Sequence, residues 1–170
     1  SVASRGLGDV YKRQETSSLD PHQADLIGIS LSSKIGKACY IPLNHNSKEN
    51  INKDLVLKKL KPLLEDPSIK KIGQNIKFDF IVLLKQGIKL SSMEDTMLMS
   101  YVLDAGKNRH NMDTLSEIHL GHKTIAFKDL VGTGKKEINF SEVDLEKAKN
   151  YAAEDADITY RPVSYTHLRA

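Results

Sequence analysis

The sequence contains no tryptophan, a single cysteine and no long hydrophobic run. With Cys39 alone, the chain cannot form an internal disulfide, which fits a reducing compartment such as the cytoplasm. Cys39 lies in the apolar stretch ACYIPL, so we expect a buried, unreactive thiol. No apolar run approaches the roughly 18 residues that indicate a membrane-spanning helix. These absences predict a cytoplasmic chain with no membrane partner.

Most of the chain carries no net charge. The formal charge is +3, but residues 1–14 carry +2 of it and residues 162–170 carry +1. Residues 15–161 are therefore neutral, and the overall charge does not by itself indicate a nucleic-acid partner. Both end segments resemble translated adapter sequence, so we expect non-native tails at 1–14 and 162–170 around one domain at 15–161. Native, poorly ordered tails are the alternative.

The middle of the chain alternates between strand and helix patterns. Two apolar runs, 25–33 and 38–45, flank the turn KIGK and predict a β-hairpin. A short buried strand is expected at 70–75, and helices are expected at 51–65, 77–86, 94–104, 112–120 and 143–160. Segment 121–142 has the pattern of a loop that carries a short helix. The order of these elements predicts an α/β fold, with a mixed sheet flanked by helices.

Three acids lie in distinct local contexts. Tyr151 and Asp155, in YAAED, would share one face of a helix. Asp79, in GQNIKFD, follows a strand end and a helix start, where ligands gather in open α/β sheets. Glu15 begins the polar segment ETSSLD. Each context alone has an ordinary alternative: Asn75 could cap the helix, Asp79 could complement the helix dipole, and Glu15 could be a surface residue.

Together and in this order, the three contexts resemble the exonuclease motifs of the DnaQ-like superfamily, in its tyrosine-containing branch. They are most similar to the 3′–5′ proofreading domains of bacterial family A DNA polymerases. That family has Asp-x-Glu-Thr, then Gln-Asn-x-Lys-x-Asp, then Tyr-x-x-x-Asp. Here QNIKFD and YAAED are complete, whereas the first motif survives only as Glu15-Thr16. The similarity spans about 15–161 and implies an RNase H-like fold with a truncated first strand.

The resemblance implies a two-metal nuclease that hydrolyses phosphodiesters at the 3′ end of DNA. Glu15, Asp79 and Asp155 would hold two divalent ions, and carboxylate ligands suit Mg²⁺ or Mn²⁺. Tyr151 would orient the attacking water, since a phenol with a pKa near 10 is a poor base at neutral pH.

The resemblance also implies partners. They are the single-stranded 3′ end of DNA and a polymerase domain of the same parent chain, and we expect a monomer. Stacking surfaces suit an enzyme that does not select sequence, because every base has a π-face. For Leu19 and Phe127, packing in the core is the alternative. The residues implied in substrate binding are Thr16, Leu19, Gln74, Asn75, Phe78, Arg109 and Phe127.

Position 13 departs from the family pattern. Arg13 stands where the family has a metal-bridging aspartate, so electrostatics should weaken metal binding strongly. We infer that a fragment boundary cut the first strand and that the parent has the aspartate. The competing explanations for the whole chain are an RNase D-like exoribonuclease and a non-catalytic nucleic-acid-binding scaffold.

Overall fold

The centre of the molecule is a five-stranded mixed sheet. The computed structural model describes residues 9–167, with side chains up to 159 and at 161. The strand order is β3-β2-β1-β4-β5, where β1–β2 and β2–β3 are antiparallel and β1–β4 and β4–β5 are parallel. The strands are β1 (Val10–Thr16), β2 (Leu26–Lys34), β3 (Lys37–Pro42), β4 (Lys71–Gly73) and β5 (Met93–Asp95).

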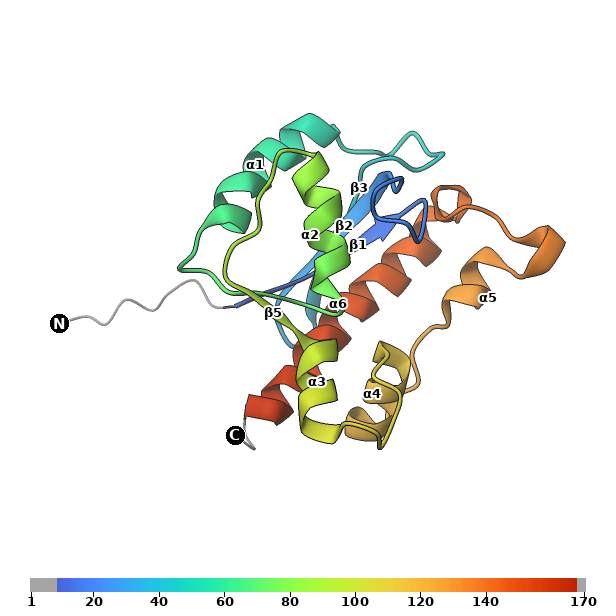
Figure 1. The fold of residues 1–170 in the computed structure, drawn as a ribbon. Coiled ribbons are helices and arrows are strands. Elements are labelled where there is room, and N and C mark those ends of the chain that lie inside the picture. Colours follow the sequence, from blue (N-terminus) through green and yellow to red (C-terminus); the bar gives the residue numbers. More distant parts are fainter. Residues whose placement is uncertain (1–8, 168–170) are drawn as a thin grey trace.

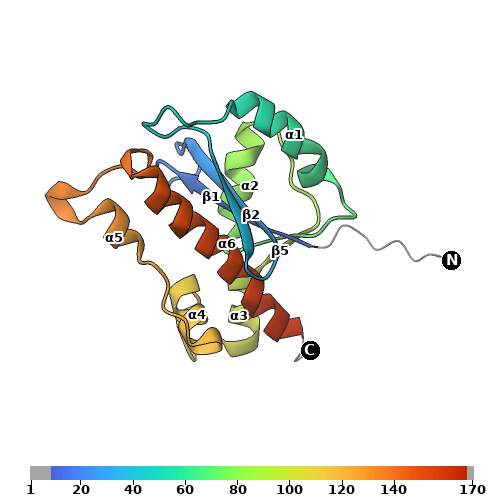
Figure 2. The same cartoon turned by 180° about the vertical axis from the view of Figure 1, so that it is seen from behind.

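Helices cover both faces of the sheet. Figures 1 and 2 show α1 and α2 on one face and the long α6 running diagonally across the other, with α3 and α4 beside its C-terminal half. Short 3-10 helices at Gly134–Lys136 and Phe140–Glu142 lie between α5 and α6. The helices are α1 (Lys53–Glu65), α2 (Ile76–Lys85), α3 (Thr96–Asp104), α4 (Met112–Leu120), α5 (Phe127–Val131) and α6 (Leu145–His167).

Each face of the sheet has its own apolar cluster. The cluster under α1 and α2 includes Leu26, Leu64 and Leu83, all fully buried. The cluster under α6 includes Ile27 and Ala152. The small, fully buried side chain of Ala152 lets α6 lie close to the sheet.

Most of the predicted elements are confirmed. The hairpin, the strand before α2 and the helices α1 to α4 form within a few residues of the expected bounds, and α6 begins within two residues of its expected start. The strand β5 was missed because three residues are too few to show a period. Cys39 is exposed, so the prediction of a buried thiol is wrong: it lies on β3, an edge strand with a neighbour on one side only.

Both predicted tails contribute to regular structure. Val10–Gln14 complete β1, a seven-residue strand at the centre of the sheet, so the first strand is not short in the folded chain. Helix α6 continues to His167, beyond the predicted end at 160. Residues 1–8 and 168–170 of the tails lie outside the described residues. Whether the tails are native to the parent chain stays a prediction about its gene.

Among the described residues, no helix is both long and apolar enough to cross a membrane.

Asp95 ties two helices to the parallel end of the sheet. Its carboxylate accepts hydrogen bonds from the backbone N–H groups of Asn75 and Ile76, both at 3.0 Å, and from Met97 N at 2.9 Å. One side chain therefore caps the N-termini of both α2 and α3. It is also 8% exposed, so these bonds are protected from water.

We expect Asp95→Ala to lower the free energy of unfolding by about 2–3 kcal/mol, because one cap contributes about 1 kcal/mol and this side chain caps two helices. Asp95→Asn keeps an acceptor and should lose less. Urea unfolding measures both. Replacing Asp54, an exposed residue in the first turn of α1, by Ala is the control. An Asp95→Ala variant no less stable than that control would contradict the shared cap.

Candidate active site

The fold brings the three predicted acids into the interior. Glu15 lies near the end of β1, Asp79 in the first turn of α2 and Asp155 in the middle of α6. Their exposed fractions are 5%, 5% and 1%. Ionised carboxylates are rarely buried this fully unless they are paired with a cation or a metal. The partners of these three acids therefore define the chemistry of the site.

Arg13 is the partner of two of them. Its Nε lies 2.8 Å from Asp155 Oδ2 and 3.8 Å from Glu15 Oε1. Because side chains two apart on a strand point to the same face, Arg13 and Glu15 both face α6, where Asp155 lies. The Arg13 side chain is 27% exposed, so the guanidinium reaches the cluster from the solvent side.

Lys12 is the partner of the third acid, and we did not anticipate it from the sequence. It points to the opposite face of β1, toward α2, and is fully buried. Its Nζ lies 3.2 Å from Asp79 Oδ2. Gln14, on the same face, donates from Nε2 to the Asp79 backbone carbonyl at 3.4 Å. The alternation of strand side chains could have placed Lys12 opposite Arg13, but nothing in the sequence shows which helix residue it meets.

Burial and mutual charge shift the pKa values of the whole cluster. Burial raises the pKa of Glu15 to about 8, opposed by Arg13. Burial also raises the pKa of Asp155 to about 6, opposed by Arg13 and by a hydrogen bond from Tyr151. Burial alone would lower the pKa of Arg13, but the negative charges of Asp155 and Glu15 outweigh burial, so the pKa rises above its ordinary value. Between Glu15 and Asp155, Glu15 therefore holds its proton to the higher pH, while Arg13 balances Asp155.

The Lys12–Asp79 pair shows the same competition. Burial lowers the pKa of Lys12 and raises the pKa of Asp79, and the attraction between the two groups opposes both shifts. Each group would be costly to bury alone as an ion. Each group therefore serves as the counter-ion that allows the other to be buried in its charged form.

These shifts predict a pH-dependent stability. A raised folded-state pKa means that the native state binds more protons than the unfolded state, so the free energy of unfolding falls as pH rises. For Asp155 this loss is complete a little above pH 6, and for Glu15 it continues to about pH 8. We expect Glu15→Gln to remove most of the slope between these two values.

Urea unfolding over this pH range in EDTA measures the slope, which for one group approaches about 1.4 kcal/mol per pH unit at most. Glu117→Gln, at an exposed position of α4, is the matched control. An equal slope in the Glu15→Gln variant would contradict the assignment.

The cluster as it stands does not fit a divalent metal. Oδ2 of Asp155 is engaged by Arg13, and Oδ2 of Asp79 by Lys12. Mg²⁺ and Mn²⁺ prefer oxygen ligands, chiefly free carboxylates and water, and these two oxygens are already paired with cations. Within residues 9–167, no group of three or more His, Cys, Asp or Glu side chains is arranged to hold a metal ion. Arg13 thus lies between two of the acids that the family resemblance implies as metal ligands, and Lys12 pairs with the third from the other face of β1.

Tyr151 and Phe127 lie together over the α6 face. Tyr151 is 5% exposed, and burial, then Asp155, raise the pKa of its hydroxyl. The Phe127 ring stacks on Phe140 with centroids 5.9 Å apart and lies 5.9 Å from the Tyr151 ring. Phe127 remains 44% exposed. It is therefore partly packed, and its contact with substrate stays a prediction.

Asn75 does not cap α2 as its position suggested. It occupies the N-cap in a left-handed conformation, with φ 54°, and its side chain makes no capping bond. Asp95 supplies the cap in its place. The side chain of Asn75 is exposed and free to bind a ligand.

The neighbours of Asn75 are arranged along one surface. Gln74 donates from Nε2 to the His110 carbonyl at 2.8 Å and accepts a hydrogen bond from Thr96, so α2, α3 and the segment before α4 meet there. Arg109, next to His110, is exposed. Phe78 differs, because it is half-buried against the core under α1 and α2.

The turn after β1 holds the remaining predicted residues. Thr16 Oγ1 donates to the Ser18 carbonyl at 3.1 Å and so shapes the turn. Leu19 is 96% exposed, so the alternative of core packing is wrong for this residue. An exposed leucine at a turn is available to meet a base.

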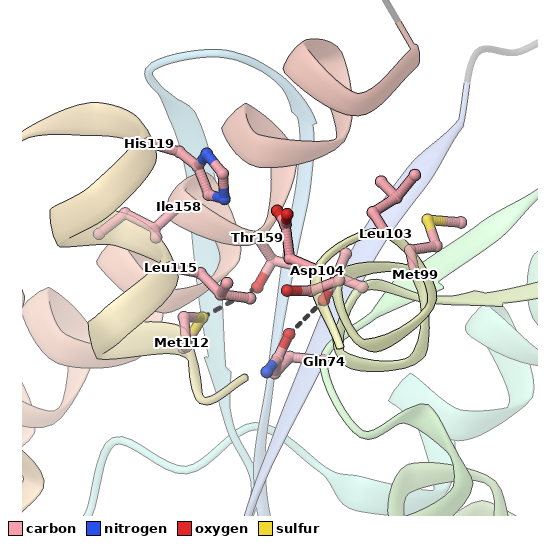
Figure 3. A pocket seen from close by; sticks show the side chains of 11 residues that line it. Gln74, Met99, Leu103, Asp104, Met112, Leu115, His119, Ile158 and Thr159 are labelled. Atoms are coloured by element: carbon pink, nitrogen blue, oxygen red, sulfur yellow. Dashed lines mark hydrogen bonds between the residues drawn. The ribbon is translucent and has the colours of Figure 1, made fainter. Parts of the chain in front are cut away.

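A separate apolar cavity of about 40 Å³ lies between α3, α4 and α6. Figure 3 shows Met99, Met112 and Ile158 around it, with Gln74 at its edge. The Thr159 hydroxyl lies 3.2 Å from Met112 Sδ. Of the predicted site residues, Gln74 alone is among those that line it within the described chain. The cavity therefore lies apart from the acids.

The sheet order and helix layers define an RNase H-like fold of the kind found in 3′–5′ exonucleases. Brucella melitensis NrnC with bound Mg²⁺ shares the fold, with a TM-score of 0.71 and 24% identity over 96% of this chain and 74% of that protein. RNase D of Escherichia coli, an exoribonuclease, shares it with a TM-score of 0.70 and 17% identity over 95% of this chain and 39% of that protein. At these identities the likeness establishes the fold, which confirms the expected class.

The sequence match is more specific. Residues 5–168 match the 3′–5′ exonuclease family found in A-type DNA polymerases, and the chain belongs to that family. DNA polymerase I of Pseudomonas aeruginosa is 46% identical over 153 residues, which cover 86% of this chain and 17% of that protein. The chain thus spans less than a fifth of the length of this relative.

Proposed function

We propose that this chain is the 3′–5′ exonuclease part of a DNA polymerase I and that its parent removes mispaired nucleotides from DNA 3′ ends. The observation that carries the proposal is the convergence of Glu15 and Asp155 on one face of the sheet, where the Arg13 Nε lies 3.8 Å from Glu15 Oε1 and 2.8 Å from Asp155 Oδ2. Asp79 is coupled to the same guanidinium. An aspartate at position 13 would therefore lie among all the groups that the family resemblance implies.

The parent is proposed to carry that aspartate, with residues 15–161 as the native domain. In the restored cluster, the four carboxylates would hold two Mg²⁺ or Mn²⁺ ions. In the chain as it stands, Arg13 turns the cluster into a set of internal ion pairs, and nuclease activity is expected to be weak. The polymerase part of the relatives would be its partner in the same chain.

Substrate would approach from the side where Arg13 is exposed. Leu19 and Phe127 offer apolar surface for the terminal bases, and exposed Asn75 and Arg109 offer polar contacts for the strand behind them. Gln74 holds this surface together through its bond to the His110 carbonyl. Thr16 acts through the shape of the turn that presents Leu19, and Phe78 supports α2 from the core side.

The substrate test uses an Arg13→Asp, Gln14→Thr variant with Mg²⁺ or Mn²⁺. Matched single-stranded DNA and RNA oligonucleotides, labelled at the 3′ or the 5′ end, are supplied separately. We expect mononucleotides from the 3′ end of DNA, with the same protein carrying Asp155→Asn as the inactive control. Preferential trimming of RNA would favour the RNase D-like alternative, whose fold this chain shares. Binding without release of mononucleotide would favour a scaffold.

A further inference from the structure

Two neighbouring cations on β1 serve opposite faces of the sheet. Lys12 points to α2 and meets Asp79, whereas Arg13 points to α6 and meets Asp155 and Glu15. Successive side chains of a strand alternate in direction, so adjacent residues can reach both sets of acids. The three carboxylates are therefore matched by two positive charges from a single dipeptide.

Both cations lie where a diffusible ion would otherwise be needed. Lys12 is fully buried, and Arg13 is largely covered. Buried carboxylates without a counter-ion destabilise a fold, and in metal-dependent sites the bound metal supplies that charge. Here the charge belongs to the chain and is present as soon as β1 joins the sheet.

We infer that Lys12 and Arg13 are built-in counter-ions that make the fold of this chain independent of divalent metal. The Arg13 Nε–Asp155 Oδ2 distance of 2.8 Å and the Lys12 Nζ–Asp79 Oδ2 distance of 3.2 Å are those of direct ion pairs. A divalent ion could bind only after displacing a tethered group that cannot diffuse away. Anything that removes the Arg13 charge leaves the buried Asp155 carboxylate without its counter-ion, and a divalent ion could then supply that charge.

The first measurement uses the unmutated chain. Its unfolding midpoint is compared in EDTA and in millimolar MnCl₂ or MgCl₂, and Mn²⁺ binding is followed by electron paramagnetic resonance. We expect midpoints equal within about 1 °C and no tight Mn²⁺ binding. If the chain bound the metal, a metal concentration a hundredfold above the dissociation constant would raise the unfolding midpoint by roughly 5 °C or more. Such a rise, or a tight Mn²⁺ signal, would overturn the inference.

The second measurement uses Arg13→Gln, which removes the charge while keeping a polar side chain. In EDTA its midpoint should fall by about 10 °C, and MnCl₂ should recover part of the loss. Lys149→Gln, which removes an exposed cation paired with Glu146, is the matched control and should show neither effect.

An Arg13→Gln variant as stable in EDTA as the unmutated chain would also overturn the inference. If this variant does not fold, the response of the unmutated chain to Mn²⁺ still decides. Neither readout uses substrate, so failure of this inference can be distinguished from failure of the proposed nuclease function.

Discussion

The Arg13→Asp, Gln14→Thr variant is expected to release 3′ mononucleotides from single-stranded DNA at least about a thousandfold faster than the unmutated chain. Arg13 lies 2.8 Å from Asp155 and 3.8 Å from Glu15, so its positive charge acts directly on two of the proposed metal ligands. A unit charge about 4 Å away contributes about 4 kcal/mol near a protein surface, and each 1.4 kcal/mol is a factor of about ten. Reversing that charge reverses the sign of the effect on a cation.

Two further variants separate charge from ligand chemistry in this experiment. Arg13→Gln removes the positive charge without adding a carboxylate, and we expect it to recover only a small part of the activity. Lys149→Asp reverses a charge on the exposed face of α6 and should leave the rate unchanged. Product release is followed with a 3′-labelled oligonucleotide and Mg²⁺ or Mn²⁺. Turnover by the unmutated chain equal to that of the restored variant would show that Arg13 does not block the site.

Replacing Asp79 by alanine should lower the free energy of unfolding by about 3–5 kcal/mol. The substitution leaves the Lys12 ammonium fully buried with its carboxylate partner gone, and breaking a buried pair from one side has this cost. The lowered pKa of Lys12 means that the lysine would then be driven to lose its proton. The variant should therefore lose less stability at alkaline pH than at neutral pH.

A double substitution tests the same pair from both sides. Lys12→Met with Asp79→Leu replaces the ion pair by apolar side chains of similar size, and we expect it to recover most of the lost stability. Glu146→Ala, which breaks an exposed pair with Lys149, is the control and should change stability by less than about 1 kcal/mol. Urea unfolding measures the free energy of unfolding of the unmutated chain, the Asp79→Ala variant, the double variant and the control. If Asp79→Ala is as stable as the control, the buried pair does not contribute as proposed.

The local order of the chain was largely predictable from its sequence. The period of apolar residues placed the hairpin and the main helices, because each of these elements is long enough to show a stripe or an alternation. Glu15, Asp79 and Asp155 could be singled out because each belongs to a short motif, and the order of the three motifs is that of one family. The match to 3′–5′ exonucleases over residues 5–168 confirms the family, and the roles of the three acids stay a prediction.

The partners across the sheet could not be predicted in the same way. Asn75 had the residue type and position of an N-cap, yet Asp95, twenty residues later, supplies the cap from β5. For Leu19 the sequence left core packing open beside substrate contact, and only its 96% exposure in the structure excludes the core. In each case the outcome depends on which segment lies nearby in space, and a single sequence contains no record of that.

Position 13 shows the division most clearly. The sequence by itself led to the prediction that Arg13 stands where the family has an acid, because motif spacing counts residues along the chain. Only the tertiary structure decided what that arginine does. The strand β1 turns Arg13 toward α6 and Lys12 toward α2, and each cation meets acids that are more than sixty residues away in sequence. Ion pairing depends on distance in space, and that distance is set by how the sheet and helices pack.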